Sequence, residues 1–338
     1  MGSNETKKIK AAITAVGGFV PDDFISNKDL EEMVDTNDEW ITARTGIKKR
    51  RILKTINKAT SYLASNAALD LFKKKETDPS SIDLVLLATI TPDFQCASTA
   101  PTVASDIRAT NAYAYDISAA CSGFLFAMST ATSYIESGRY KKILVIGADM
   151  MSSIVDYNDR STSILFGDGA GAVLVEPSKN NYGWEDEYLR SDGIGAEWLK
   201  VKSGGSMFPT NKETVKNKWH FITQDGKTVF KSAVSEMANA TQQIMMRNNL
   251  NSDEIKYLLP HQANKRIIDA TAEKINLDKN KVLMNIEDYG NTTAATIPLL
   301  MNDYENKFKV GDKLILAAFG AGLTWGAAYL TWAYNKTN

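Results

Sequence analysis

The sequence of 338 residues contains few cysteine and histidine residues. It has two cysteines, Cys96 and Cys121, and two histidines, His220 and His261. Two cysteines cannot build a disulfide framework, and the sequence contains no zinc-binding spacing. We therefore expect a reducing, cytoplasmic compartment and no metal site.

Long apolar runs and an excess of charge are also absent from the sequence. The first residues, MGSNETKKIKAAITAVGG, include too short an apolar stretch for a signal peptide or a membrane span. The formal net charge of -1 argues against a general role on nucleic acids or membrane surfaces. We interpret two local basic clusters, KKRR at 48–51 and KKK at 73–75, as solvated faces.

What the sequence does contain is a series of short runs rich in Val, Ile and Leu. They lie at 82–87, 142–147, 171–175, 255–259, 313–317 and 326–331. Glycine, proline or charged residues bound each run, and segments of helical length lie between many of them. This pattern predicts the buried strands of an α/β protein.

The two halves of the chain resemble each other. Ile82 and Ile255 begin similar apolar runs, and Lys142 and Lys313 begin the next pair of runs. The members of both pairs are separated by nearly the same stretch of chain, close to half its length. Such matching offsets indicate an internal repeat, although buried strands can also resemble each other by chance.

The repeat predicts two similar α/β halves at 1–180 and 181–338. The first would carry the nucleophilic cysteine, and the second would carry the histidine and asparagine described below. No stretch rich in Gly, Ser or Pro suggests a flexible linker, so we expect the halves to pack together. The polar stretch 177–220 is the expected insertion or crossover.

Cys121 follows a β-like segment and precedes an apolar helical segment that ends near Gly138. It should lie at a strand-to-helix turn, where unpaired N–H groups and the helix dipole favour a thiolate. Small neighbouring residues leave room for a substrate carbonyl. The alternative is a structural cysteine, which is the more common role of a lone cysteine in such a stretch.

Two further side chains are candidates for the same chemistry. His261 directly follows the run at 255–259, and strand ends are where α/β folds place functional groups. Asn291 follows Cys121 at nearly the same offset as the paired strands, so we expect it to occupy in the second half the position of Cys121 in the first. Its alternative role is a turn and helix cap. We interpret His220 as structural.

Cysteine, histidine and asparagine together predict acyl transfer. A thiolate attacks an acyl carbonyl, and the acyl-enzyme divides one difficult step into two easier ones. Backbone N–H groups stabilise the oxyanion. Histidine and asparagine can donate hydrogen bonds to a second carbonyl and stabilise an enolate there.

Two glycine-rich stretches need separate interpretation. FGDGAGAVLVE at 166–176 matches a dinucleotide-binding pattern, but an apolar strand follows where that motif requires a helix, so we exclude it. FGAGLTWG at 319–326 predicts a tight turn between the last two strands, where backbone could approach a substrate.

Six motifs together resemble the 3-oxoacyl-[acyl-carrier-protein] synthase III family of the thiolase-like superfamily. In family order they are VDTNDEWITARTGI (34–47), DISAACSGF (116–124), DRSTSILFGDGAGA (159–172), PHQANKRI (260–267), GNTTAATIP (290–298) and FGAGLTWG (319–326). Members initiate type II fatty-acid synthesis. The resemblance covers almost the whole chain and implies a duplicated, five-layer αβαβα fold and a homodimer.

The resemblance implies a ping-pong condensation. An acyl-CoA primer, acetyl or short branched, loads onto Cys121; malonyl-acyl-carrier protein then loses carbon dioxide and condenses to 3-oxoacyl-carrier protein. By motif position, His261 and Asn291 hold the malonyl thioester carbonyl, and Phe319 favours decarboxylation. The oxyanion donors would be the N–H groups of Cys121 and Ala321. Acyl-CoA is a substrate here, and no cofactor is implied.

The resemblance also implies a site for coenzyme A. Trp40 and Arg160 would sandwich the adenine, and the stacking of Trp and Arg on a base is physically reasonable. Thr36 and Arg44 would lie nearby. Asn264 would contact the pantetheine arm.

Two more sets of residues follow from the same resemblance. Arg266 and Lys265 would contact the acidic carrier protein, where loss of charge mainly slows association. Cys96, Met151 and Phe166 would belong to the acyl pocket. Some family members have a phenylalanine at the position of Cys96, which reaches the pocket of the partner subunit, so we expect a roomier pocket here and acceptance of branched or longer primers.

Several other functions remain open. A related ketosynthase of secondary metabolism would use the same motifs on larger acyl groups. Elongating ketosynthases use two histidines, and His220 lies outside any matching motif. In a papain-like hydrolase the separation between Cys121 and His261 would fit, but ACSGF is not its signature. A catalytically inactive binding protein would not be expected to keep all three candidate residues.

Overall fold

The apolar runs form two mixed β-sheets in the computed structural model, which describes residues 9–336. The first sheet has the strand order β1 (Ala11–Phe19), β7 (Gly169–Pro177), β6 (Ile143–Asp149), β4 (Leu84–Ala88), β5 (Tyr113–Ile117). The second has the order β11 (Tyr257–Pro260), β12 (Lys313–Gly320), β13 (Thr324–Thr331), β8 (Trp184–Ser191). All six predicted strands are therefore confirmed, with boundaries shifted by a few residues.

The strand order confirms the internal repeat. In the first sheet β4 pairs in parallel with β6, β6 pairs antiparallel with β7, and β7 pairs antiparallel with β1. In the second sheet β11, β12, β13 and β8 follow the same order with the same directions. The chain passes from the first sheet to the second between Pro177 and Trp184. The division into domains at residue 180 stays a prediction.

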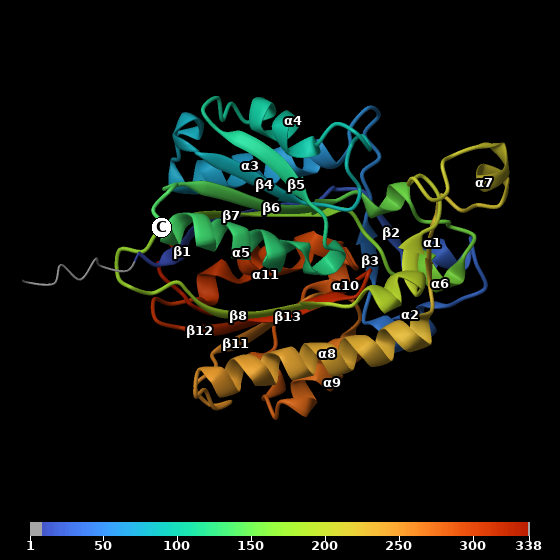
Figure 1. Cartoon of the computed structure of the whole chain (residues 1–338). Helices are drawn as coiled ribbons and strands as arrows, with labels where there is room; N and C mark the ends of the chain where they lie inside the picture. Colours follow the sequence, from blue (N-terminus) through green and yellow to red (C-terminus); the bar gives the residue numbers. More distant parts are fainter. Residues whose placement is uncertain (1–8, 337–338) are drawn as a thin grey trace, which may run out of the picture.

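Helices form the other three layers (Figure 1). One outer layer consists of α3 (Thr60–Lys75) and α4 (Thr99–Asp106), and the other of α8 (Gly226–Arg247) and α9 (Lys265–Lys274). Between the sheets lie α5 (Gly123–Glu136) and α11 (Thr296–Tyr304). The alternation of helix and sheet confirms the expected αβαβα layering.

The smaller elements gather at one end of the layers in Figure 1. The short strands are β2 (Phe24–Ser26), β3 (Lys49–Arg51), β9 (Leu199–Val201) and β10 (Ile222–Gln224). The short helices are α1 (Asn27–Glu31), α2 (Asp38–Thr45), α6 (Arg160–Ser163), α7 (Lys212–Lys216) and α10 (Ile286–Tyr289). Among the helices of residues 9–336, none has both the length and the apolar character needed to cross a bilayer.

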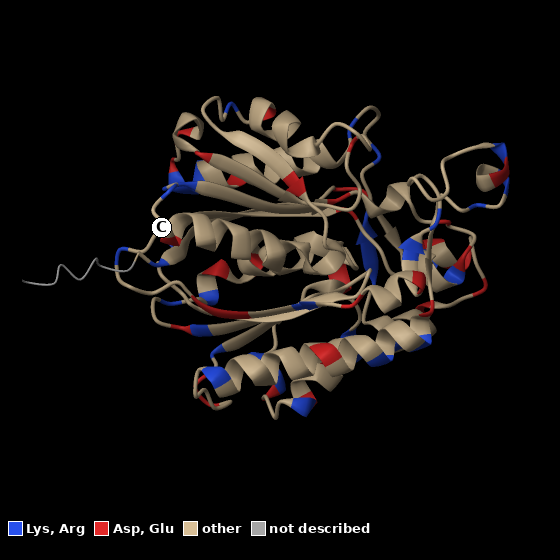
Figure 2. Cartoon of the chain, viewed as in Figure 1, with Lys and Arg blue, Asp and Glu red and all other residues tan. Residues whose placement is uncertain are grey.

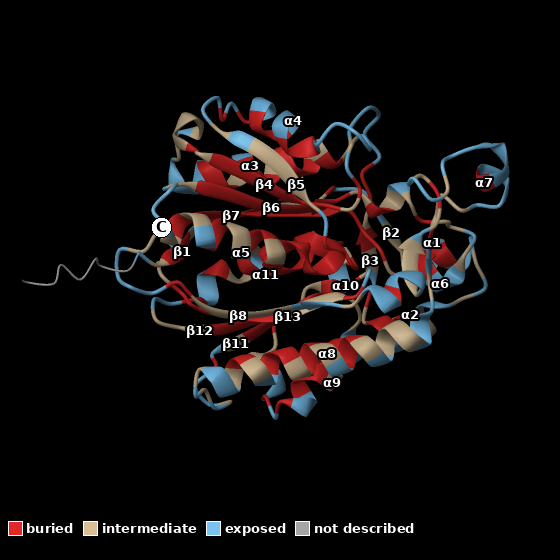
Figure 3. Ribbon diagram, in the orientation of Figure 1, coloured by how far each residue is buried: buried red, intermediate tan, exposed pale blue. Residues whose placement is uncertain are grey.

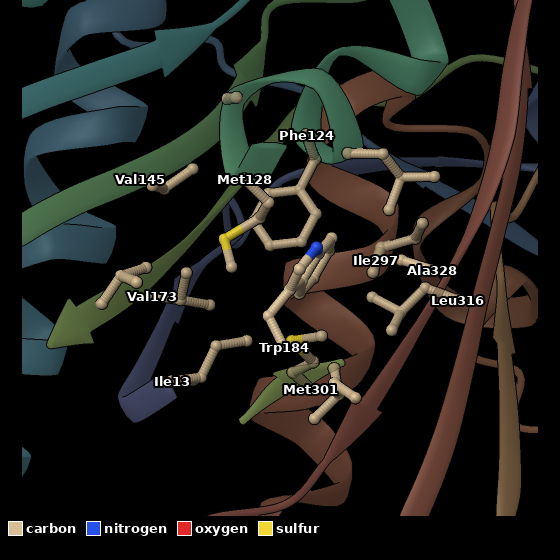
Figure 4. Close-up of a cluster of buried hydrophobic side chains, with 14 of the residues drawn as sticks. Ile13, Phe124, Met128, Val145, Val173, Trp184, Ile297, Met301, Leu316 and Ala328 are labelled. Atoms are coloured by element: carbon tan, nitrogen blue, oxygen red, sulfur yellow. The ribbon is translucent and has the colours of Figure 1, made fainter. Parts of the chain in front are cut away.

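The core between the sheets is packed around Trp184 of β8 (Figure 4). Phe124 and Met128 reach it from α5, and Ile297 and Met301 reach it from α11. Figure 3 shows the inner strands of both sheets and the inner helix faces as buried, whereas the edge strands β5 and β8 are partly exposed. Each large apolar side chain buried here contributes roughly 2 kcal/mol to stability, so the central helices are held rigidly beneath the turns that carry the site.

Two expectations about polar segments are wrong in part. The stretch 177–220 is not only an insertion, because it contains β8, an edge strand of the second sheet. Most residues of β8 are half-buried, so this edge strand has a polar sequence although it pairs with β13. The excursion itself begins after Ser191 and includes β9, α7 and β10.

The basic cluster at 48–51 is not a solvated face throughout. Arg50 is 1% exposed, and its Nε and Nη2 atoms donate to the carbonyl oxygen of Ile164 at 2.9 and 2.6 Å. Its Nη1 atom donates to the side chain of Asn27, and burial lowers its pKa to about 9. The cluster at 73–75 is exposed, as expected.

Candidate active site

Cys121 lies in a tight turn between β5 and α5. Ala120 adopts a left-handed conformation with φ of 47°, and a single 3-10 turn at Ala120–Ser122 leads into the helix. The Ser122 hydroxyl donates to the Thr324 carbonyl at 2.8 Å, and the Thr324 hydroxyl donates to the Ala119 carbonyl at 2.8 Å. These bonds fix the cysteine turn against the first residue of β13.

The turn between β12 and β13 contacts the cysteine directly. A Cβ atom added to Gly320 would lie 2.7 Å from the backbone nitrogen of Cys121. Such close approach of backbone to backbone is possible only for glycine. Ala321, the second expected oxyanion donor, is the next residue and is half-buried in the predicted turn.

Asn291 lies near the equivalent turn of the second half, but not at the position of Cys121. The counterpart of the left-handed Ala120 is Thr293, with φ of 50°, which precedes α11 in the same way. This correspondence aligns Cys121 with Ala294 and places Asn291 three residues before that position. The expected equivalence is therefore wrong by three residues, because the turns keep the offset of the first strand pair, whereas the chain from the turn to the next strand is shorter in the second half.

The position of Asn291 is fixed by its own contacts. Its backbone N–H donates to Leu165 at 2.9 Å, and its carbonyl accepts from the N–H of Gly167 at 3.1 Å. Its Oδ1 atom accepts from the backbone N–H of Thr293 at 2.9 Å. The side-chain NH₂ group is then left to serve as a donor.

His261 begins directly after β11, as expected from the sequence. Its backbone N–H donates to Ala317 of β12 at 2.7 Å, and its Nδ1 atom lies 2.8 Å from the Thr296 hydroxyl at the start of α11. The side chain is 1% exposed, and burial lowers its pKa to about 3. The imidazole is thus neutral and can donate from only one nitrogen.

One cavity of about 570 Å³ brings these residues together. Its walls include Cys121, His261, Asn291 and Phe319, which come from both halves of the chain. A site of this size accommodates a small organic ligand. The structure thus collects a thiol, two hydrogen-bond donors and an aromatic ring in one cavity.

The expectation of a thiolate at Cys121 is wrong for the free protein. Burial, and secondarily the negative charge of Asp149, raises the pKa of the Cys121 thiol to about 12. The loss of water outweighs the attraction of the helix N-terminus, which is worth at most about 2 kcal/mol. The free protein therefore holds a neutral thiol.

Asp149 connects the Asn291 turn to the residues that follow β4. Lying at the end of β6 and fully buried, it accepts hydrogen bonds from the Thr293 hydroxyl and, at 3.3 Å, from the Ala294 N–H. It also accepts from the hydroxyl groups of Thr89 and Thr91 at 2.9 and 3.0 Å. Burial raises its pKa despite these bonds. This carboxylate, which the sequence motifs did not single out, ties the Asn291 turn to the first sheet.

The expected coenzyme A residues lie at the mouth of the cavity. Trp40, Arg44 and Asn264 line it. Arg44 and Arg160 both lie over the Trp40 ring, with guanidinium carbons 4.6 and 5.0 Å from its centroid. Thr36 is half-buried, and its hydroxyl has no hydrogen-bond partner within residues 9–336.

The observed spacing is too small for an adenine between Trp40 and Arg160. An adenine stacked between the Trp40 ring and the guanidinium group needs roughly 7 Å between those two groups, which is twice the usual stacking distance. The exposed Arg160 would have to move, which would break the 2.8 Å bond that its Nη1 atom donates to the Asp35 carbonyl.

Of the two residues expected to contact carrier protein, Arg266 lines the cavity and Lys265 does not. Arg266 is exposed, lines the cavity, and lies 5.3 Å over the ring of Phe230. Lys265 is exposed and forms an ion pair with Asp269 at 2.5 Å, outside the cavity lining.

The three residues expected in the acyl pocket lie in different places. Phe166 lines the cavity, and Met151 is fully buried behind it in the same apolar cluster. Cys96 is exposed and does not line the cavity of its own chain. Its expected role in the pocket of a partner subunit stays a prediction.

The sequence motifs missed the wall formed by the first turns of α8. Lys227, Phe230 and Lys231 line the cavity, and Asp225 caps the helix by accepting from the Thr228 N–H at 3.2 Å. The stretch DGKTVFK shows the helix start, but nothing in it indicates which face meets the site. Arg44, Arg266 and these two lysines give the mouth a positive charge.

Comparison with known proteins agrees with this geometry. The family profiles described as 3-oxoacyl-[acyl-carrier-protein (ACP)] synthase III and its C-terminal part match residues 115–193 and 245–332. A beta-ketoacyl-[acyl-carrier-protein] synthase III of Chlorobium chlorochromatii (strain CaD3) is 54% identical and covers 96% of this chain and 100% of its own.

Two solved structures have the same fold. The 3-oxoacyl-[acyl-carrier-protein] synthase III of Aquifex aeolicus VF5 is 41% identical, has a TM-score of 0.87 and covers 96% of this chain and 100% of its own. The priming beta-ketosynthase of the R1128 polyketide pathway is 29% identical, has a TM-score of 0.89 and covers 100% of both chains. The chain is a thiolase-like α/β protein and belongs to the 3-oxoacyl-[acyl-carrier-protein] synthase III family of acyl-transferring condensing enzymes.

Proposed function

We propose that this chain condenses an acyl-CoA primer with malonyl-acyl-carrier protein as the first step of type II fatty-acid synthesis. The observation that carries the proposal is the single cavity in which Cys121, His261 and Asn291 meet. No bound cofactor is needed, because acyl-CoA is consumed as a substrate. Cytoplasmic localisation stays a prediction from the cysteine content.

The first half-reaction is a thioester exchange. The Cys121 sulfur attacks the primer carbonyl and the bond to coenzyme A breaks, so that the thiol proton ends on the released coenzyme. Because the pKa of the free thiol is raised to about 12, the proton must leave as the new bond forms. The N–H groups of Cys121 and Ala321 are the proposed donors to the oxyanion.

The second half-reaction uses the other half of the chain. Malonyl thioester loses carbon dioxide, and the electrons of the broken C–C bond form an enolate. A neutral His261 and the Asn291 amide donate hydrogen bonds to its oxygen, and the apolar ring of Phe319 disfavours the carboxylate. The enolate carbon then attacks the acyl-Cys121 carbonyl, and the released sulfur takes up a proton.

The positive mouth of the cavity supports the choice of substrates. Arg44, Lys227, Lys231 and Arg266 lie on the path to Cys121. Coenzyme A and the prosthetic group of a carrier protein both present phosphate next to a thin pantetheine arm. Arg266 and Lys265 are exposed and would meet the acidic carrier protein.

We also propose that the enzyme is a homodimer joined through β5. This strand is an edge of the first sheet, where unpaired backbone groups favour the addition of another strand. Tyr113 on this edge is 42% exposed and stacks with Tyr115 at 6.1 Å. A second copy would cover this surface and bring its Cys96 toward the partner's acyl pocket. Sedimentation should give the mass of two chains.

A second candidate is a priming ketosynthase of secondary metabolism with longer acyl groups. The structural likeness to a polyketide priming ketosynthase supports it, and the small side chain at Cys96 would suit a larger primer. The two candidates share every catalytic step and differ in the primer.

Mass spectrometry after incubation with a panel of acyl-CoAs tests both proposals. We expect an acyl adduct on the intact protein that is absent in Cys121→Ala. A preference for acetyl or short branched chains supports fatty-acid initiation, and a preference for longer chains supports the second candidate. Strict acetyl preference that Cys96→Phe leaves unchanged would contradict the roomier pocket, and no adduct with any acyl-CoA would contradict primer loading.

A further inference from the structure

A second cavity lies at the opposite end of β6 from the active site. Its volume is about 750 Å³. Its walls come from β1, the end of α3, the residues just before β6, the end of β7 with the segment after it, Glu305, and the residues after β13. Asp149, next to the cysteine and asparagine turns, ends the same strand that begins at this cavity. None of the residues with an expected catalytic or substrate-binding role lines it.

Six lysines line this second cavity: Lys74, Lys75, Lys141, Lys142, Lys179 and Lys336. Two carboxylates, Glu176 and Glu305, also line it, and Asp70 next to it pairs with Lys74, which leaves an excess of three positive charges. The whole chain has a formal net charge of -1. Figure 2 shows the blue segments that gather beside the chain end marked C.

The two carboxylates neutralise only part of this charge. Lys75 pairs with Glu176, and the Lys336 ammonium lies 3.4 Å from Glu305. The hydroxyl of Tyr334 donates to the other oxygen of Glu305 at 2.7 Å, so that this carboxylate is held against the wall. Both acids therefore have partners of their own and do not fill the centre of the cavity.

The remaining lysines differ in how they are held. Lys74 pairs with Asp70 at 2.6 Å, and Lys142 donates to the Ser81 hydroxyl at 3.0 Å. Lys141 and Lys179 are exposed, and neither ammonium group has an ion pair or hydrogen bond within residues 9–336. These two lysines can turn toward a ligand without the loss of an internal bond.

We propose that this cavity binds a small molecule with two or more linked phosphate groups. Ammonium groups act as point charges for phosphate, and several of them around one space match a ligand with several negative charges. A carboxylate or single sulfate would leave at least one of these three charges unmatched. The volume is within the range of small-ligand sites and accepts a diphosphate alone or a nucleotide. The ligand would be an effector, because the cavity lies apart from the reacting thiol.

Calorimetric titration of the full chain with inorganic pyrophosphate and with ATP tests this site. The titrations are made with saturating coenzyme A, which occupies the phosphate-binding mouth of the active site. We expect both probes to bind, more weakly at high salt. Equal affinities would show that the phosphates alone are recognised, and a tighter ATP complex would identify the nucleotide.

Charge reversal locates the binding. Lys141→Glu with Lys179→Glu should weaken pyrophosphate binding by about tenfold or more, since each reversal replaces an attraction to the phosphates by a repulsion. The matched control is Lys212→Glu with Lys216→Glu, two exposed lysines of α7 outside both cavities. It should change the affinity by less than about twofold, because these charges are screened.

Several results would overturn the proposal. They are no binding at millimolar pyrophosphate, equal losses in both pairs of variants, or binding that coenzyme A abolishes. Binding of single-stranded RNA without binding of pyrophosphate would also overturn it, in favour of a macromolecular partner. Lys141→Gln with Lys179→Gln should give a smaller loss of the same kind, which separates charge from misfolding.

Discussion

The Nδ1 atom of His261 lies 2.8 Å from the hydroxyl oxygen of Thr296, and that oxygen also lies 3.0 Å from the Thr293 carbonyl. A hydroxyl has one proton and can donate to only one of these two partners. Only donation to Nδ1 places the His261 proton on Nε2, from which it can be donated to a substrate carbonyl, whereas donation to the Thr293 carbonyl leaves the proton on Nδ1. The proposed mechanism therefore requires Thr296 to donate to Nδ1 and to act as a positioning residue that selects this histidine tautomer.

Thr296→Val should slow malonyl decarboxylation by about tenfold or more, because the valine cannot hold the donating tautomer. Acyl loading on Cys121 should change little. Thr296→Ser keeps the hydroxyl and should restore the rate, which a role in packing alone would not predict. Equal rates in Thr296→Val and the parent protein would contradict this role for Thr296.

Asp149→Asn should lower the free energy of unfolding by about 2–4 kcal/mol, because an amide places donors against the buried donors around it. Loss of the negative charge should also lower the pKa of Cys121, so alkylation at a fixed pH becomes faster. Urea unfolding and iodoacetamide kinetics measure the two effects.

Asp168→Asn is the matched control for that variant. Asp168 is also buried, accepts from the N–H of Leu53 and Ser152 at 2.8 Å each, and has a pKa raised to about 6 by burial. Its replacement should destabilise the fold by a similar amount and leave Cys121 alkylation nearly unchanged. Equal acceleration in both variants would contradict the electrostatic effect of Asp149.

Gly320→Ala should reduce acyl loading by about tenfold or more. The new Cβ would lie 2.7 Å from the Cys121 nitrogen and 3.1 Å from the Ser122 nitrogen, so the cysteine turn must shift. A shift of this kind displaces a proposed oxyanion donor. Gly193→Ala, where a Cβ meets nothing within 4 Å, should load normally. Single-turnover loading of acyl-CoA measures both.

The reactivity of Cys121 should rise steadily with pH. Its pKa is raised to about 12, so the thiol is protonated at neutral pH and the thiolate fraction grows about tenfold for each pH unit below that value. Alkylation of the free protein between pH 7 and 9 measures this. A plateau above pH 7 would show instead that the helix N-terminus keeps a thiolate.

The sequence predicted six strands and the turn of Cys121 because local signals fix them, but it missed β1 and β8. Runs of Val, Ile and Leu mark buried strands, and Gly138 marks the end of α5. His261 could be placed because it directly follows such a run. These features depend on residues that are close together in the chain.

The features that were missed depend on contacts between distant segments. The local sequence suggests a solvated Arg50, because only the folded chain brings the carbonyl of Ile164 beside its guanidinium group. The protonation of Cys121 depends on burial, which no motif shows. The segment between the turn and the next strand is shorter in the second half, so the offset of the later strands misaligned Asn291 with Cys121 by three residues.

The central claim is that the first half carries the acyl group and the second half activates the malonyl group. The most direct test measures both half-reactions in His261→Ala, with acyl loading followed by mass spectrometry and malonyl decarboxylation by release of carbon dioxide. We expect loading within about threefold of the parent rate and decarboxylation reduced by about a hundredfold or more. Loss of loading with intact decarboxylation would contradict the claim.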